Sequence, residues 1–320
     1  METRILSDTG LRVSRACLGT MTFGGQTDRA AAARMLGCAL DRGVNFVDTA
    51  NVYMGGESER ILGELMGARR SSIVLASKVA MKVGDETPGL SRAAILSAVE
   101  KSLSRLRTDY LDIYYLHAPD YGVPIEESLE AMNALVTQGK VRHIGSSNYA
   151  SWQVCDMLHI ANRNGFPAPR ICQPMYNVIA RRIEDELLPM CKALGVATVV
   201  YNPLAGGLLT NKHKTSTPIP GTRFDGNKAY QDRYWNDVNF SAVCRLAEVA
   251  RSTGRSTVSV ALNWLLHHSP ADCIILGASK PEHLEMNLTA CGEGPLPEEA
   301  VAACDDLWTL LRGAAPKYNR

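Results

Sequence analysis

The fold is indicated most clearly by Tyr110–Leu116, with the sequence YLDIYYL, a nearly continuous apolar run that ends at the polar residue His117. Two earlier apolar runs also end at a charged residue, namely Val44–Val47 at Asp48 and Ser72–Ser77 at Lys78. A charged side chain that closes a buried strand costs free energy unless another group uses it. We therefore expect these strand ends to meet at one mouth that forms an active site. Tyr53 joins them there, because it lies in the loop after Asp48.

Strand and helix patterns alternate along nearly the whole chain, after an opening hairpin of Arg4–Leu6 and Leu11–Val13. The expected strands are Ala16–Leu18, Val44–Val47, Ser72–Ser77, Tyr110–Leu116, Val141–Ser146, Ile171–Met175, Val196–Val200 and Cys273–Leu276. The expected helices are Asp28–Arg42, Ser58–Met66, Ser91–Leu106, Ile125–Gln138, Trp152–Asn164, Glu184–Leu194, Phe240–Thr253, Val258–His267, Pro281–Thr289 and Glu298–Leu311. Glycines that follow several of these helices indicate where they end.

This alternation implies a parallel sheet covered by helices, and the competing interpretation is a doubly wound open sheet. No Gly-x-Gly-x-x-Gly turn follows the first strand, since Gly24-Gly25 comes late and lacks that spacing. Polar residues also end nearly every strand, whereas an open sheet gathers them at one switch point. We therefore predict a single α/β domain over residues 1–320. It is a (β/α)8 TIM barrel with an N-terminal β-hairpin, a long loop after strand 7, a C-terminal helix and tail, and its active site at the carboxyl ends of the strands.

The long loop after strand 7, Leu208–Asn239, is rich in glycine, proline, lysine and aromatic residues. Loops of this length are usually functional lids or disordered segments. Because this loop contains Arg223, Tyr230, Arg233 and neighbouring aromatic side chains, we expect it to act as a lid.

The composition is that of an ordinary globular protein, with 46% apolar residues, 21% charged residues and a formal net charge of +1. This charge gives no reason to expect binding to nucleic acid or to an acidic membrane surface. The nine cysteines form no Cys-x-x-Cys pair and no zinc spacing, so we expect a reducing compartment and no metal site. Cys38, Cys155 and Cys244 fall at expected helix core positions. With no signal peptide and no apolar stretch of about 20 residues, we expect a cytoplasmic protein.

Several motifs together resemble the aldo-keto reductase superfamily. They are Asp48-Thr49-Ala50-x-x-Tyr53, Gly56-Glu57-Ser58-Glu59, Lys78, Leu116-His117, Ile144–Tyr149, Gln173–Asn177, Tyr201–Thr210 and Leu276–Ser279. They occur in the expected order and cover nearly the whole chain. Four further segments, Pro203–Gly207, Arg223-Phe224, Asp232–Trp235 and Glu293–Leu296, resemble the branch of aflatoxin-aldehyde and succinic-semialdehyde reductases. The resemblance implies carbonyl reduction with a nicotinamide cofactor, and it leaves a homodimer open.

The four polar residues expected at the mouth suit proton donation to a carbonyl oxygen, and we call them the tetrad: Asp48, Tyr53, Lys78 and His117. Tyr53 is the expected acid, because a phenol donates more readily when a cation stabilises the phenolate. Lys78 would be that cation, and Asp48 would pair with it and offset its burial. A neutral His117 would donate a second hydrogen bond to the same oxygen, as charge develops there.

The cofactor residues are expected at the remaining strand ends. Ser147, Asn148 and Gln173 offer hydroxyl and amide groups for a nicotinamide carboxamide, and Tyr201 would stack beneath the ring. Gly206 and Gly207 allow a pyrophosphate to approach the backbone closely. Ser279 and Lys280, at a helix start, are candidates for the adenosine 2′-phosphate, which favours NADP(H). The resemblance adds as cofactor contacts Met21, Asp48, Asn202, Pro203, Leu204, Leu208, Lys212, Arg223, Gly277, His283 and Asn287.

The substrate is expected to be a small carbonyl compound. The resemblance places Tyr230, Arg233 and Arg320 at the substrate, often at its carboxylate, which paired arginines bind well. Met54, Met21 and Trp235 are expected to line an apolar wall, with His117 at the carbonyl. The sequence thus favours an NADPH-dependent reductase of aldehydes, with dicarbonyls, carboxylated aldehydes or ketones as further substrates. It leaves open a cofactor-binding regulatory or redox-sensing barrel with slow turnover, or a biosynthetic ketoreductase.

Overall fold

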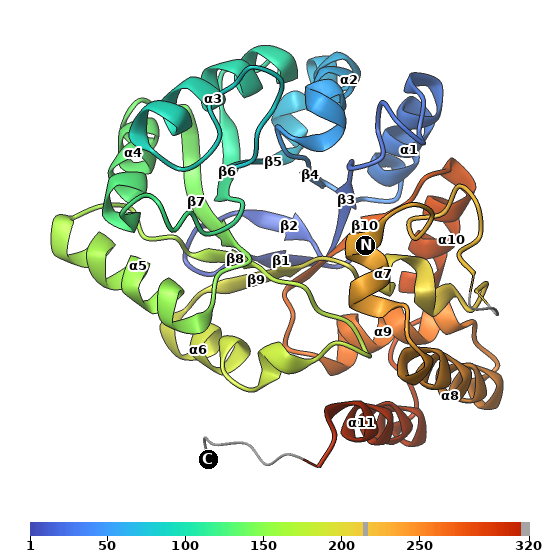
Figure 1. The fold of residues 1–320 in the computed structure, drawn as a ribbon. Coiled ribbons are helices and arrows are strands. Elements are labelled where there is room, and N and C mark those ends of the chain that lie inside the picture. The colour runs from blue at the N-terminus through green and yellow to red at the C-terminus, as the bar shows by residue number, and fades with distance from the viewer. Residues whose placement is uncertain (214–216, 315–320) are drawn as a thin grey trace.

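A computed structural model of the protein describes residues 1–213 and 217–314, in which eight parallel strands close into a barrel (Figure 1). The order around the barrel is β10-β3-β4-β5-β6-β7-β8-β9, so neighbouring strands are consecutive in the chain except for β10 and β3, which close the barrel. The strands are β3 (Ala16–Gly19), β4 (Phe46–Asp48), β5 (Val74–Val79), β6 (Leu111–Leu116), β7 (Val141–Ser147), β8 (Ile171–Gln173), β9 (Ala197–Val200) and β10 (Cys273–Gly277). This arrangement confirms the predicted closed barrel and excludes the open sheet.

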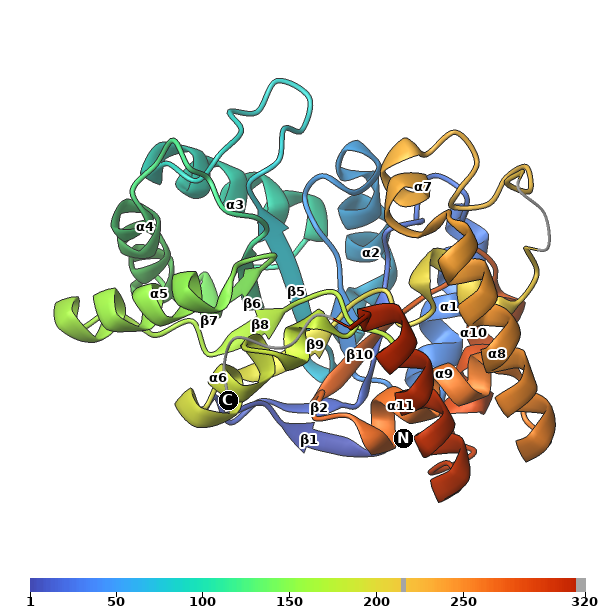
Figure 2. The same ribbon diagram turned by 60° about the horizontal axis from the view of Figure 1, so that its bottom comes forward.

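Helices surround the barrel and bury their apolar faces, while one of them, α7 (Lys228–Tyr234), lies at an end of the barrel (Figure 1, Figure 2). They are α1 (Arg29–Asp41), α2 (Glu57–Met66), α3 (Arg92–Leu106), α4 (Ile125–Thr137), α5 (Ser151–Asn164), α6 (Leu187–Leu194), α7 (Lys228–Tyr234), α8 (Asp237–Thr253), α9 (Thr257–His268), α10 (Pro281–Cys291) and α11 (Glu298–Arg312). The predicted N-cap Ser91 is confirmed, because its side chain accepts a hydrogen bond from the amide of Ala94. In the part of the chain that the model covers, no helix combines the length and the apolar character needed to cross a bilayer.

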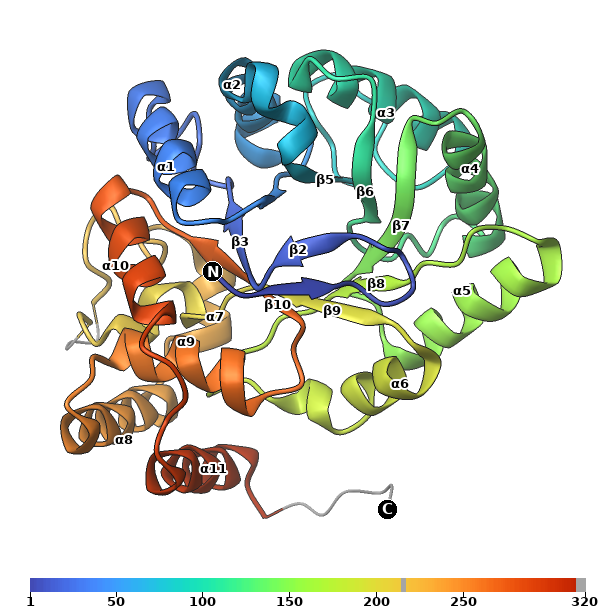
Figure 3. The same cartoon turned by 180° about the vertical axis from the view of Figure 1, so that it is seen from behind.

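The hairpin of β1 (Thr3–Ile5) and β2 (Arg12–Ser14) lies across one end of the barrel (Figure 3). Leu6 and Val13 are fully buried there, in one cluster with the interior residues Cys17, Phe46 and Ile113. Figure 2 shows α7 and the loop between β5 and α3 at the opposite end. The hairpin therefore closes the amino end of the strands, and the carboxyl end is left for a site.

Several element boundaries differ from the predicted ones for local reasons. β5 starts at Val74, because residues 67–72 form a 3₁₀ turn instead of strand. β8 stops at Gln173, because the following proline has no amide hydrogen to donate to the ladder. α8 starts at Asp237 and not at Phe240, since the Asn236 side chain caps it.

The long loop after β9 contains a helix, α7 (Lys228–Tyr234), that the sequence analysis did not predict. The Asn227 side chain caps it by accepting a hydrogen bond from the amide of Tyr230. The predicted burial of two cysteines is wrong, because Cys155 and Cys244 are exposed on α5 and α8. Cys38 is partly buried and packs against the core, and all nine cysteines are free thiols.

Candidate active site

The four predicted tetrad residues come together at the carboxyl end of the barrel. Asp48 is the last residue of β4, Lys78 lies near the end of β5, and His117 directly follows β6. Tyr53 opens the 3₁₀ turn Tyr53–Gly56, which contains a non-glycine residue, Met54, at a φ of 50°. Left-handed backbone at such a residue is uncommon and gathers at functional sites.

Lys78 is the centre of this group and is completely buried. Its Nζ donates to Asp48 Oδ1 at 2.5 Å, to the carbonyl of Thr49 at 2.8 Å and to the Tyr53 hydroxyl at 3.1 Å. Burial lowers the pKa of Lys78, but the charges of Asp48 and Tyr53 and the hydrogen bonds to them raise it above its ordinary value. Lys78 is therefore a cation in contact with the tyrosine oxygen.

Tyr53 keeps its proton at neutral pH. Burial raises the pKa of its hydroxyl, the charge of Lys78 opposes this rise, and the charge of Asp48 adds to it. The Lys78 ammonium also lies 4.8 Å from the centre of the Tyr53 ring. The result is a protonated phenol whose conjugate base would form next to a fixed cation.

His117 lies beside Tyr53, with the two ring centres 6.1 Å apart and the rings nearly perpendicular. Burial, with a contribution from the charge of Lys78, lowers the pKa of His117 to about 3. The imidazole is therefore neutral over the physiological range, in agreement with the expectation from the sequence. Its backbone amide donates to the carbonyl of Val79 at 2.8 Å, which fixes the residue to β5.

The residues expected at a nicotinamide carboxamide lie at the neighbouring strand ends and are joined to the tetrad. Asn148 Nδ2 donates to the carbonyl oxygen of His117 at 2.9 Å, and the Tyr201 hydroxyl donates to Asn148 Oδ1 at 2.7 Å. The Ser147 hydroxyl donates to the carbonyl of Gln173 at 2.9 Å. Gln173 Nε2 donates to Asp48 Oδ2 at 2.8 Å, a link that the sequence analysis did not find.

The residues expected at the phosphates gather between the loop after β9 and the start of α10. Gly206 and Gly207 have left-handed φ values of 68° and 100°. A Cβ at Gly206 would lie 2.8 Å from the ring of Tyr230, so this position requires glycine. The same stretch includes Asn202, Pro203, Leu204, Leu208 and Lys212.

Positive charge collects at the same place. Partial burial and the charges of Lys212 and Lys280 lower the pKa of His283. Lys280 precedes the first residue of α10, and Asn287 of that helix is buried. Gly277 ends β10, and the following carbonyls of Ala278 and Ser279 accept hydrogen bonds from Thr22 and Thr27, two contacts that the sequence analysis missed.

The loop after β9 reaches across to the loop after β3. Arg223 Nη1 contacts the sulfur of Met21 at 3.4 Å, and Gln26 Nε2 donates to the carbonyl of Gly221 at 2.9 Å. Met21 and Arg223, two residues predicted at the cofactor and 202 positions apart in the chain, therefore meet. These contacts join the two loops, and the role of the loop after β9 as a lid stays a prediction.

The residues expected at the substrate are only partly brought together. The guanidinium groups of Arg223 and Arg233 both lie over the ring of Tyr230, at 5.4 Å and 5.5 Å from its centre. Trp235 instead packs in an aromatic cluster with His213, Phe224 and Phe240. Met54 is exposed at the mouth, and Arg320 lies outside the described residues.

A network of charged residues next to β5, which the sequence did not predict, lies close to Lys78. Glu59, buried on α2, accepts hydrogen bonds from Ser77 at 2.6 Å and from Arg105 at 2.7 Å. Arg105 also donates to Glu86 at 2.7 Å. Because Ser77 precedes Lys78 and Glu86 lies in the loop after β5, this network fixes that loop next to the tetrad.

A hollow of about 450 Å³ lies between the segments that follow Lys78 and His117. It is lined by Ala80, Met81, Pro88, Gly89, Ala118, Pro119, Asp120 and Tyr121. The Asp120 carboxylate accepts the backbone amides of Leu90 and Gly122, so its charge is already used to hold the two loops together. The hollow offers both apolar and polar contacts.

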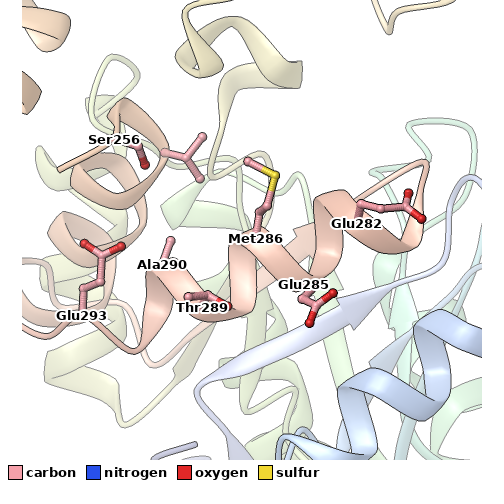
Figure 4. A pocket seen from close by; sticks show the side chains of 8 residues that line it. Ser256, Glu282, Glu285, Met286, Thr289, Ala290 and Glu293 are labelled. Carbon is pink, nitrogen blue, oxygen red and sulfur yellow. The ribbon is translucent and has the colours of Figure 1, made fainter.

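A second hollow, of about 440 Å³, lies on the outer surface along α10 (Figure 4). Three glutamates line it, and Figure 4 shows them spread along the helix and the turn after it. Glu285 pairs with Arg42 at 3.2 Å, and Glu293 accepts a hydrogen bond from Ser259 at 2.6 Å. Among the residues that the structure describes, no group of three or more histidine, cysteine or acidic side chains is arranged to hold a metal ion.

The fold and the tetrad define a class of protein, a (β/α)8 barrel enzyme in which a buried lysine donates a hydrogen bond to a tyrosine hydroxyl at the mouth of the barrel. The chain belongs to the aldo-keto reductase family, whose model, "Aldo/keto reductase family", matches residues 15–309. It is therefore an oxidoreductase of that family, as the resemblance implied.

Comparison with individual proteins agrees with this assignment. The chain is 40% identical over 320 residues to "Aflatoxin B1 aldehyde reductase member 2" of Mus musculus, which covers 95% of this chain and 87% of the relative. It is 38% identical over 321 residues to the Rattus norvegicus protein of the same name, with the same coverage. It is 34% identical over 304 residues to "Probable voltage-gated potassium channel subunit beta" of Oryza sativa subsp. japonica, covering 92% and 93% of the two chains.

The side chains at the mouth fit a nicotinamide dinucleotide, the cofactor type typical of this family. Amides and a hydroxyl at the ends of β7 and β8 match the donors and acceptors of a carboxamide. Left-handed glycines and nearby cationic groups suit phosphates. The first set follows β7 and β8, and the second follows β9 and β10, so the two sets lie at adjoining strand ends of the barrel.

Proposed function

We propose that the protein reduces aldehydes to alcohols with NADPH, and that dicarbonyls, carboxylated aldehydes and ketones are further substrates. The observation that carries this proposal is the position of Lys78 Nζ, which bonds to the Asp48 carboxylate and to the Tyr53 hydroxyl at once. A buried cation on a protonated phenol favours proton donation to an oxygen on which negative charge develops.

In the proposed reaction, NADPH supplies the hydride that reaches the carbonyl carbon. The Tyr53 O–H bond breaks as its proton passes to the carbonyl oxygen, which gives the alcohol. Lys78, 3.1 Å from the Tyr53 oxygen, stabilises the phenolate that remains. Neutral His117 offers an N–H to the same carbonyl oxygen and orients it.

The preference for NADPH over NADH is supported by the positive charge near the start of α10. Lys212, Lys280 and His283 lie close enough together for the two lysine charges to lower the pKa of the histidine. Such a cluster suits the 2′-phosphate, which NADH lacks. Arg233, near Tyr230 at the mouth, supports a preference for aldehydes that carry a carboxylate, and the hollow between the segments that follow Lys78 and His117 supports bulkier ones.

Steady-state oxidation of NADPH by the purified protein tests this proposal, with para-nitrobenzaldehyde and succinic semialdehyde as substrates. Turnover of both, at about 1 s⁻¹ or faster, is the expected result. Binding of NADPH without turnover of any carbonyl compound would instead favour the second candidate, a cofactor-binding regulatory or redox-sensing barrel. The similarity to a protein named as a potassium channel subunit is the observation that favours this second candidate.

A further inference from the structure

Gln173 makes a contact that its role at a carboxamide does not require. Its Nε2 donates to Asp48 Oδ2 at 2.8 Å, although the two residues lie 125 positions apart and on different strands of the barrel. Both side chains are buried, with exposures of 3% and 2%. The other oxygen of the same carboxylate accepts the Lys78 ammonium. Asp48 is thus held between a lysine and a glutamine.

These bonds form one continuous chain. It runs from Gln173 to Asp48 at 2.8 Å, from Asp48 to Lys78 at 2.5 Å, and from Lys78 to the Tyr53 hydroxyl at 3.1 Å. The backbone of Gln173 is also fixed, because its carbonyl accepts the Ser147 hydroxyl at 2.9 Å. A change in the hydrogen bonding of the Gln173 amide therefore affects the tetrad through Asp48.

We propose that Gln173 is a positioning residue that links the nicotinamide carboxamide to the acidity of Tyr53 through Asp48 and Lys78. The inference rests on the proposed function, and it adds a second role to a residue that was assigned only to cofactor binding. In this role, a bound cofactor prepares the proton donor as well as supplying the hydride.

The planar amide of Gln173 explains how the link works. One N–H of Nε2 is used on Asp48, and the Tyr115 hydroxyl on β6 also interacts with this amide, so Oε1 is the atom left for the carboxamide. When Oε1 accepts a hydrogen bond, the amide becomes more polarised and its N–H becomes a stronger donor. A stronger donor neutralises more of the Asp48 charge, which otherwise raises the pKa of Tyr53.

Other charged and titratable groups lie around this chain, directly or next to a group that does, and they come from several elements. They are Cys17 on β3, Tyr115 on β6, His117 after β6, Tyr201 after β9, Tyr230 and Arg233 on α7, and Cys273 on β10. Within residues 1–213 and 217–314, none of these side chains donates a hydrogen bond to Asp48, whose side-chain donors are Lys78 and Gln173. Gln173 and Lys78 are therefore the side chains that set how much of the Asp48 charge reaches Tyr53.

The test is the pH dependence of hydride transfer in single turnovers with saturating NADPH, so that neither cofactor affinity nor product release enters the rate. The alkaline limb of this profile reports loss of the Tyr53 proton. In Gln173→Met the donor is absent, and we expect the limb to move upward by roughly half a pH unit or more, with a slower plateau. Gln173→Glu places a second carboxylate beside Asp48, and its limb should lie higher still.

Asn148→Ala is the matched control, because Asn148 lies at the same end of the site and its side chain bonds to the His117 carbonyl and to Ser147, not to Gln173 or Asp48. It should weaken NADPH binding and leave the limb where the parent has it. An unmoved limb in both Gln173 variants, with only weaker NADPH binding, would overturn the inference while the proposed function stands. A parent protein without hydride transfer would refute the proposed function instead. Tryptophan fluorescence checks that each variant is folded. If Gln173→Met is not folded, the position of the alkaline limb in Gln173→Glu alone decides the test.

Discussion

Replacing Lys78 by methionine separates the structural role of the buried ion pair from its chemical role. Methionine fills most of the volume but leaves the Asp48 carboxylate, which is 2% exposed, with Gln173 as its remaining side-chain donor. Removing one partner of a buried pair costs about 3–5 kcal/mol, because an uncompensated charge stays in the interior. The same change removes the cation from the Tyr53 oxygen, and we expect hydride transfer to slow by about 10²–10⁴-fold.

The double variant Asp48→Asn, Lys78→Met distinguishes the two effects. The double variant has no unpaired carboxylate at position 48, and the amide oxygen that replaces it still accepts a hydrogen bond from Gln173. It should therefore regain most of the lost stability but none of the lost rate. Urea unfolding followed by tryptophan fluorescence measures the first quantity, and single-turnover NADPH oxidation measures the second. A double variant whose loss of stability equals the sum of the two single losses would refute the reasoning, because independent sites add and coupled sites do not.

Three further predictions concern the rest of the site. The pKa of His117 is lowered to about 3 in the folded protein, so the unfolded chain takes up the histidine proton at a higher pH than the folded one, and the stability present above about pH 6.5 is lost as the pH falls toward 3. In urea unfolding, His117→Gln should therefore lose less stability than the parent across that window, by on the order of a few kcal/mol. An equal loss in both proteins would contradict the assignment. Lys280→Met should weaken NADPH binding roughly ten- to hundredfold and leave NADH binding nearly unchanged, as measured by fluorescence titration. Arg233→Met should raise the KM for succinic semialdehyde and spare a neutral aldehyde of matched length, since binding of a remote carboxylate enters KM and not kcat.

The parts of the site that could be predicted from the sequence are those that local pattern determines. A charged or polar residue after an apolar run marks a strand end, and three such runs were enough to bring Asp48, Lys78 and His117 to one mouth. Tyr53 followed because its loop is short and begins at Asp48. The barrel followed from the regular alternation of strands and helices, which leaves few topologies.

The parts that could not be predicted depend on long-range register or on weak local signals. The contact between Gln173 and Asp48 crosses the barrel interior, and nothing near either residue in the chain indicates the other. Helix α7 is short and lies among glycines and prolines, so its capping asparagine was not recognised. Cys155 and Cys244 were placed in the core because the apolar periodicity of their helices does not fix which face a small residue takes.

The central claim is that Tyr53 donates the proton with Lys78 as its stabilising cation. Single-turnover hydride transfer to para-nitrobenzaldehyde by Tyr53→Phe, with NADPH binding measured in the same preparation, tests this claim most directly. We predict a rate about 10²–10⁴-fold below the parent with a nearly unchanged NADPH dissociation constant, because the ring remains and only the transferable proton is lost. A Phe variant that transfers hydride within about threefold of the parent rate would contradict the account, since loss of the proton donor would then cost less than a general acid normally contributes.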